Sequence, residues 1–161
     1  MKIAQNAIGV GFLLFTLVDG FLKLYTVREL KDKPEILKKS GMISFPIETF
    51  DPKLDENEED TIIRLIREEI GLPIHQIKKF GIVPRNFFLL PDRKDIKTVY
   101  GYGLFTGNSN DTPTPSDNDI VFSGWKTTGE LLSLPSIRIE TDPILKDFLL
   151  EGRITDIYIA L

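Results

Sequence analysis

Two β-rich runs separated by Asp-Gly constrain the fold of this chain more than any other feature. The runs cover residues 8–17 and 21–27, and Val18, Asp19 and Gly20 lie between them. Asp-Gly between apolar runs is a strong signal for a β-hairpin, because both residues tolerate the positive φ angles of a tight turn. The sequence therefore predicts a domain that begins with a β-hairpin.

The most clearly marked helix follows an acidic stretch. Asn57 is a favourable N-cap residue, and the three residues after it are acidic, as the N-terminus of a helix prefers. Gly71 is well placed just beyond the C-terminus. We predict a helix over residues 58–70 whose apolar stripe faces the core. That stripe consists of Ile62, Ile66 and Ile70, widened by Ile63.

The remaining patterns complete an α+β domain. Further strands are predicted at residues 42–45, 77–90, 98–106 and 120–125, and helices at 128–134 and 142–150. Asp142 is expected as the N-cap of the last helix, with Pro143 in its first position. No repeat or linker interrupts the chain, so residues 1–161 are expected to form one domain, a mixed α/β sandwich.

Two segments are predicted to be loops. Residues 31–40 are charged and broken by Pro34, which is typical of a surface loop. Residues 108–119 consist of Asn, Asp, Thr, Pro and Ser, a composition that buries little apolar surface. We expect this second segment to be a mobile loop.

Composition excludes several classes of function. A net charge of −4 provides no basic surface for nucleic acid, so no nucleic-acid partner is expected. The chain has no cysteine, which rules out disulfides and thiolate zinc sites, and His75 alone cannot form a histidine cluster and is expected at the surface. The apolar run at residues 7–18 is too short to span a bilayer. Cytoplasmic localisation without a membrane partner is the default expectation.

The segment over residues 44–72 resembles the Nudix box of the Nudix hydrolases. The matching positions, at the required spacing, are Glu56, Arg64, Ile66, Glu68, Glu69, Gly71 and Leu72. Two positions depart from the pattern: Leu65 stands where the family has Glu, and Phe50 where it has Gly. Residues 65, 68 and 69 are spaced i, i+3 and i+4, which predicts that they share one helical face turned toward a cleft. Leucine thus replaces one carboxylate of that face.

The resemblance implies a Nudix-like fold, in which a central mixed sheet lies between helices, and a catalytic site. It implies that Glu68, Glu69 and Arg64 are catalytic, with Arg64 orienting the glutamates, and that Glu68, Glu69 and Glu56 bind Mg²⁺ or Mn²⁺. Magnesium often uses only one or two carboxylates together with substrate phosphates and water. The implied activity is metal-dependent hydrolysis of a diphosphate linkage in a small nucleotide-like substrate.

Other functions and other site residues stay open. The chain could be an inactive Nudix-fold module that binds a nucleotide or a protein, or a structural domain whose pocket is filled by Ile47, Phe50 or Leu65. A homodimer is an open alternative for its assembly. A further acid could come from Asp117, Asp119 or Glu130. Five aromatic residues could stack on a base, although core packing is the favoured interpretation: Tyr100, Tyr102, Phe87, Phe88 and Trp125.

Overall fold

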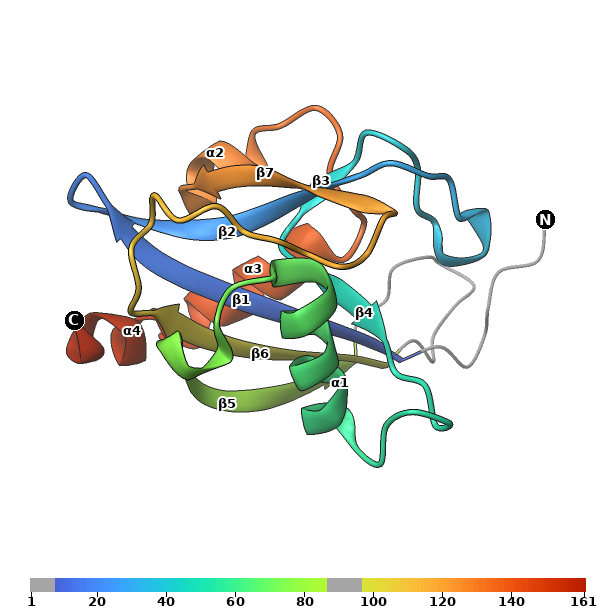
Figure 1. The fold of residues 1–161 in the computed structure, drawn as a ribbon, viewed down its shortest axis with the longest axis horizontal. Coiled ribbons are helices and arrows are strands. Elements are labelled where there is room, and N and C mark those ends of the chain that lie inside the picture. Colours follow the sequence, from blue (N-terminus) through green and yellow to red (C-terminus); the bar gives the residue numbers. More distant parts are fainter. Residues whose placement is uncertain (1–7, 87–96) are drawn as a thin grey trace.

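A seven-stranded mixed sheet forms the centre of the molecule in the computed structural model, which describes residues 8–86 and 97–161. The strand order is β3-β2-β1-β6-β5, with β4 also paired to β1 and β7 to β2 (Figure 1). β1 and β6 are parallel, and the other pairings between described strands are antiparallel. The strands are β1 Gly9–Val18, β2 Phe21–Glu29, β3 Ile43–Ser44, β4 Ile47–Thr49, β5 Ile77–Asn86, β6 Lys97–Phe105 and β7 Ile120–Lys126.

Helices cover both faces of the sheet. The helical segments are α1 Glu58–Leu65, α2 Thr128–Leu132, α3 Thr141–Leu150 and α4 Ile154–Ala160, with short turns η1 Pro34–Ile36, η2 Ile66–Ile70 and η3 Ile74–Gln76. Ile62, Leu65 and Ile66 pack with Phe12 into one core cluster. Phe148 of α3 belongs to a second cluster. α1 and α3 lie on opposite sides of the sheet (Figure 1), which confirms the predicted α+β sandwich.

The N-terminal hairpin confirms the first sequence prediction. β1 and β2 are antiparallel, and Val18 pairs directly with Phe21. The two residues between them, Asp19 and Gly20, have φ angles of 52° and 82°. Positive φ at both central positions is the requirement of a tight hairpin turn, which explains why Asp-Gly stands here.

The predicted helix over residues 58–70 consists of α1 followed by a π-helical turn, η2. The Asn57 side chain accepts a hydrogen bond from the Asp60 amide at 3.0 Å, which confirms the N-cap. At the other end the Gly71 amide donates to the Ile66 carbonyl at 2.8 Å, and Gly71 has a φ of 66°. One prediction about the stripe was wrong: Ile63 is 37% exposed, because it lies on the outer side of the helix.

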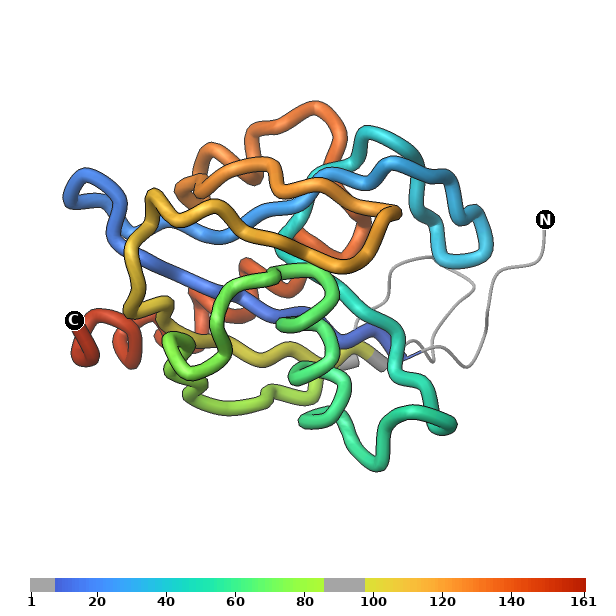
Figure 2. Tube along the Cα trace, viewed as in Figure 1, coloured from blue at the N-terminus to red at the C-terminus, as the bar shows by residue number. Residues whose placement is uncertain are grey.

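Residues 107–119 form no helix or strand and lie beside the end of η2 (Figure 2). The Thr114 amide donates to the Gly71 carbonyl at 3.1 Å, and the Asp117 amide donates to the Glu68 carbonyl at 2.9 Å. A Cβ atom at Gly71 would lie 2.2 Å from the Thr114 carbonyl carbon, so glycine also permits this close approach. These contacts attach the segment to the helix, and its mobility stays a prediction.

Several element boundaries differ from the predictions. The strand expected at residues 42–45 is shorter, and β4 follows it after Pro46. α3 begins at Thr141 with Glu140 in the N-cap position, so Asp142 is not the cap. α4 was not predicted. β5 ends at Asn86, and the predicted residues 87–90 lie outside the described part of the chain.

Within the described residues, none of the helices has the length and apolar character that crossing a membrane requires.

We expect Ile66→Ala to lower the free energy of unfolding by about 2–5 kcal/mol, because the side chain is 1% exposed in the core beneath α1. Urea denaturation of both proteins measures the change. Ile63→Ala is the matched control on the same helix and should cost less than about 1 kcal/mol. Equal losses for the two variants would contradict the observed facing of the helix.

Candidate functional site

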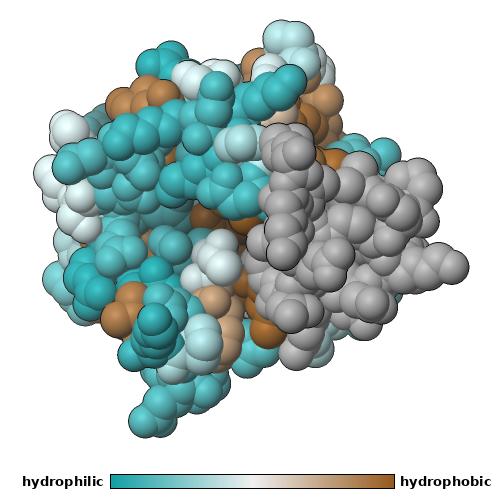
Figure 3. Space-filling view, turned by 90° about the vertical axis from the view of Figure 1, so that its right-hand side faces the viewer, coloured by the Kyte–Doolittle hydropathy of each residue, from teal (hydrophilic) through white to brown (hydrophobic). Residues whose placement is uncertain are grey.

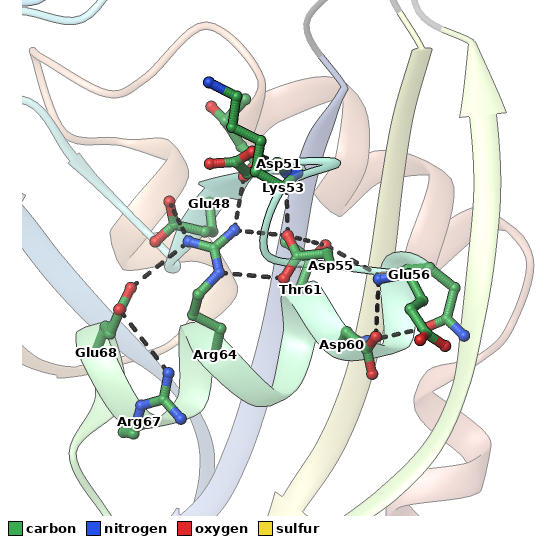
Figure 4. A network of polar contacts seen from close by, with 12 residues as sticks. Glu48, Asp51, Lys53, Asp55, Glu56, Asp60, Thr61, Arg64, Arg67 and Glu68 are labelled. Atoms are coloured by element: carbon green, nitrogen blue, oxygen red, sulfur yellow. Dashed lines mark hydrogen bonds and ion pairs between the residues drawn. The ribbon is translucent and has the colours of Figure 1, made fainter.

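Arg64 lies at the centre of the polar network on α1 (Figure 4). Its guanidinium binds both carboxylate oxygens of Asp55, with Nε to Oδ1 at 3.2 Å and Nη2 to Oδ2 at 2.7 Å. Nη2 also donates to the Thr49 carbonyl at 3.0 Å. Nη1 lies 3.2 Å from Glu48 Oε1 and 3.6 Å from Glu68 Oε2. One cation therefore organises groups from β4, the loop before α1 and η2.

Asp55, and not Glu56, is the acid that fixes Arg64. Asp55 is 5% exposed and also accepts hydrogen bonds from the Thr61 hydroxyl and the Asp51 amide, both at 3.0 Å. The hydrogen bonds from Arg64 lower the pKa of Asp55 to about 2. The exposed Glu56 lies beside Asp60, at the opposite end of the network from Glu68 (Figure 4). The structure does not bring Glu56 together with Glu68, in contrast to the metal-ligand set that the sequence resemblance implied.

Glu48, which the sequence analysis missed, contributes a carboxylate from β4. It stands on the opposite side of Arg64 Nη1 from Glu68, and the two acids share that guanidinium nitrogen. Burial raises the pKa of Glu48 and Glu68 raises it further, while Arg64 acts in the opposite direction. The resemblance offered one signal, because Phe45-Pro46-Ile47-Glu48 stands where Phe-Pro-Gly-Gly commonly precedes the Nudix box.

Glu69 is buried on the core side of the π turn. It is 2% exposed, and its Oε2 atom has no hydrogen-bond partner among the described residues. Burial raises its pKa well above the usual range, and the charge of Glu48 adds to this effect. Tyr25 holds the backbone here, because its hydroxyl donates to the carbonyls of Glu69 at 3.2 Å and Ile70 at 2.7 Å. A cation between Glu48 and Glu69 would give the Oε2 atom of Glu69 a partner and would reduce the repulsion between the two carboxylates.

Leu65 does not lie beside Glu68 at the surface. It is fully buried in the core cluster beneath α1. Residues 62, 65, 66 and 69 follow the spacing of the buried stripe, and Leu65 belongs to this stripe for that reason. Among the residues that the structure describes, no three acidic or imidazole groups are already arranged to hold a metal ion.

A buried group of charges borders the site. Lys38 Nζ lies 3.0 Å from Glu29 Oε2, and Arg138 lies 3.4 Å from both Glu29 Oε1 and Glu140 Oε1. The charges of Arg138 and Glu29 act on Glu69 in opposite directions. Arg138 and Glu29 are 109 residues apart in the chain, so no local pattern could have revealed the group.

Figure 3 shows the molecule from the right-hand side of Figure 1, and the described surface there is largely hydrophilic around a central hollow.

Of the three further acids considered in the sequence, Asp117 is the one whose charge acts on Glu69. Asp119 pairs with Lys31 at 2.8 Å and Lys33 at 3.2 Å. Glu130 forms the capping box of α2 with Thr127. His75 is exposed, as expected.

The described aromatic candidates are structural. Tyr100 and Tyr102 are buried against α3 and α4, and their hydroxyls donate to Asp147 at 2.5 Å and Asp156 at 2.6 Å. Trp125 stacks on Phe105 with ring centroids 6.0 Å apart. The core interpretation is confirmed for these three residues, whereas Phe87 and Phe88 lie outside the described part.

The chain has the fold of the Nudix hydrolases. It superposes on the NUDIX domain of Shewanella oneidensis NrtR in complex with ADP ribose with a TM-score of 0.56 and 21% identity, covering 86% of this chain and 80% of that one. For the Nudix hydrolase RenU of M. smegmatis the values are 0.62 and 14%, with coverages of 95% and 87%.

A third similar structure is a bifunctional NMN adenylyltransferase/ADP ribose pyrophosphatase of Francisella tularensis, complexed with AMP and a Mn ion. Its TM-score is 0.61 at 16% identity, covering 91% of this chain and 42% of that one. No protein-family model and no curated protein matches the sequence. The shared property is therefore the fold.

We expect Asp55→Asn to lower the free energy of unfolding by about 3 kcal/mol at neutral pH, because it leaves the largely buried Arg64 without its main partner. Glu56→Gln, the matched control one residue away, should change it by less than about 0.5 kcal/mol. The pKa of Asp55 lies near 2 in the folded protein and at 3.8 without these contacts, so the stabilisation is complete above the higher value.

The difference between wild type and Asp55→Asn should accordingly shrink as the pH falls from about 4 toward 2. Urea denaturation across this range measures it. A larger loss for Glu56→Gln than for Asp55→Asn would contradict the assignment of Asp55 as the main partner of Arg64.

We expect Leu65→Glu to lower the free energy of unfolding by at least about 3 kcal/mol, because it buries a carboxylate without a partner in the core. It should not strengthen Mg²⁺ binding, since the side chain of residue 65 lies in the core and that of Glu68 is part-exposed. Thermal unfolding and calorimetric titration with Mg²⁺ test both points. A folded Leu65→Glu protein that binds Mg²⁺ more tightly than wild type would contradict the observed orientation.

Proposed function

We propose that this Nudix-fold chain hydrolyses the diphosphate linkage of a nucleoside-diphosphate derivative, with Mg²⁺ or Mn²⁺ as cofactor. The observation that carries the proposal is the Glu48 carboxylate on β4, which shares Arg64 Nη1 with Glu68 and whose charge acts on Glu69. The ligands named for two similar structures, ADP ribose in one and AMP with a Mn ion in the other, support a substrate of this class.

The side chains present fit a divalent cation. Among the described residues no donor binds Oε2 of the buried Glu69 carboxylate, and the charge of Glu68 raises the pKa of Glu48. Hard divalent cations prefer carboxylate oxygens of this kind. In the proposed site Glu48, Glu68 and Glu69 hold the ion, which would neutralise the diphosphate charge and polarise the phosphorus toward attack by water.

Arg64 and Asp55 have a positioning role in this proposal. Asp55 fixes the guanidinium through two hydrogen bonds, so Arg64 in turn restrains Glu48 and Glu68 through its third nitrogen. Both ion pairs of that nitrogen are longer than the shortest bond to Asp55, at 3.2 and 3.6 Å against 2.7 Å. The two glutamates can therefore turn toward a cation while Arg64 stays in place.

A second candidate function is an inactive module that binds a nucleotide without hydrolysing it. The burial of Leu65 favours it, because the helix lacks the carboxylate that the family pattern has at this position. Under this alternative ADP-ribose binds, no product forms with either metal, and binding does not depend on Glu69.

The test is a hydrolysis assay on ADP-ribose and other nucleoside-diphosphate derivatives, with Mg²⁺ and with Mn²⁺. We expect Glu69→Gln and Glu48→Gln each to lower kcat/KM by about 100-fold or more, because each removes a charge that contacts the reacting centre. Glu35→Gln, on the exposed turn η1, is the matched control and should leave activity unchanged.

Calorimetric titration of Mg²⁺ provides an independent readout, and Glu48→Gln should bind the ion at least about tenfold more weakly. Metal-dependent hydrolysis that is insensitive to Glu48→Gln would remove Glu48 from the site. Binding of ADP-ribose without any turnover would favour the inactive module.

A further inference from the structure

A pocket lies beside α1 and η2, on the side of Ile63 and Arg67. Its volume is about 700 Å³. Its lining comes from the helix (Ile63, Arg67), from the residues after Gly71 (Leu72, Ile74) and from the segment after β6 (Asp111, Thr112). Small-molecule pockets commonly have volumes of about 300–1,000 Å³, mostly apolar walls and a few polar groups. This pocket has both properties.

The walls of the pocket are already assembled. The Thr114 amide and hydroxyl both bind the Gly71 carbonyl, at 3.1 and 3.3 Å. The Asp111 amide closes a turn on the Asn108 carbonyl at 3.0 Å, and Pro113 is buried. A ligand would therefore meet a wall that is already hydrogen-bonded to Gly71, which lowers the entropic cost of binding.

The apolar lining is exposed without a partner inside the described chain. Ile63 is 37% exposed and Ile74 46% exposed, and both border the same pocket. A smaller neighbouring pocket of about 310 Å³ shares Ile63 and Arg67 and reaches Leu54, which is 66% exposed. Its other lining residues are charged and belong to the Arg64 network: Asp55, Asp60, Arg64 and Glu68. Isolated exposed apolar residues need no explanation, but a contiguous set around a concave surface indicates a binding site.

Arg67 supplies a cation at the edge of this pocket. Its side chain is 68% exposed, and the nearest carboxylate oxygen described, on Glu68, is 4.0 Å away. An ion pair at that distance and exposure contributes little. The guanidinium is thus free to bind an anionic group in the bidentate manner that arginine favours.

We propose that this pocket binds a small amphiphilic molecule with an apolar body and one anionic group, the body lying on Ile63, Leu72 and Ile74 and the anion on Arg67. The site uses none of the carboxylates assigned to hydrolysis, so it does not depend on the proposed function. The bound molecule would bridge α1 and the segment over residues 111–114, which is hydrogen-bonded to the backbone of Gly71.

The test uses 4-phenylbutyrate as probe, with the metal-free wild-type protein in isothermal titration calorimetry. We expect saturable binding, and no binding of acetate, which lacks the apolar body. Arg67→Gln should weaken binding of 4-phenylbutyrate about fivefold, because it removes one solvent-exposed charge interaction. Arg28→Gln, which removes an exposed arginine from β2, is the matched control and should bind like wild type.

Backbone amide chemical shifts locate the probe. Shifts confined to residues 63–74 and 111–114 would support the proposal. It would be overturned by the absence of saturable binding, by equal affinity of Arg67→Gln and wild type, or by shifts that centre on Glu48 and Glu69. The neutral 4-phenylbutanamide should bind Arg67→Gln and wild type equally, and a difference between them would also overturn the assigned role of Arg67.

Discussion

The bidentate pair of Arg64 and Asp55 is the interaction on which the rest of the site depends. It joins the loop before α1 to the helix, and the remaining guanidinium nitrogen reaches β4 and η2. Removing a guanidinium from water is costly, and the cost is offset here by hydrogen bonds to Asp55 and to the Thr49 carbonyl. The position of Glu48 relative to Glu68 follows from this arrangement.

The π turn determines how the two adjacent glutamates are presented. Its hydrogen bond from Gly71 to Ile66 replaces the usual α-helical one, and Tyr25 binds the two carbonyls at its end. Glu69 is then directed into the interior, while Glu68 stays part-exposed beside Arg64. Such turns occur frequently at functional sites, where they set side-chain directions that a regular helix cannot.

The candidate site combines carboxylates from different elements of the fold. The helix carries leucine where the Nudix pattern has glutamate, and a strand supplies the nearby carboxylate of Glu48. A cation responds to the positions of oxygen atoms and not to the order of residues in the chain. The substitution in the motif and the added acid on β4 are therefore best considered together.

The sequence by itself determined the features that depend on local chemistry. Asp19-Gly20 specified the hairpin turn, Asn57 the start of α1 and Gly71 its end, because each acts through the backbone of its neighbours. Tertiary structure alone decided which acid binds Arg64, that Leu65 enters the core and that Glu48 joins the site. Asp55 and Glu56 are adjacent acids, and only the fold of the loop before α1 shows that Asp55 pairs with Arg64. The contacts between β4, η2 and residues 108–119 connect distant segments, and only packing in three dimensions brings them together.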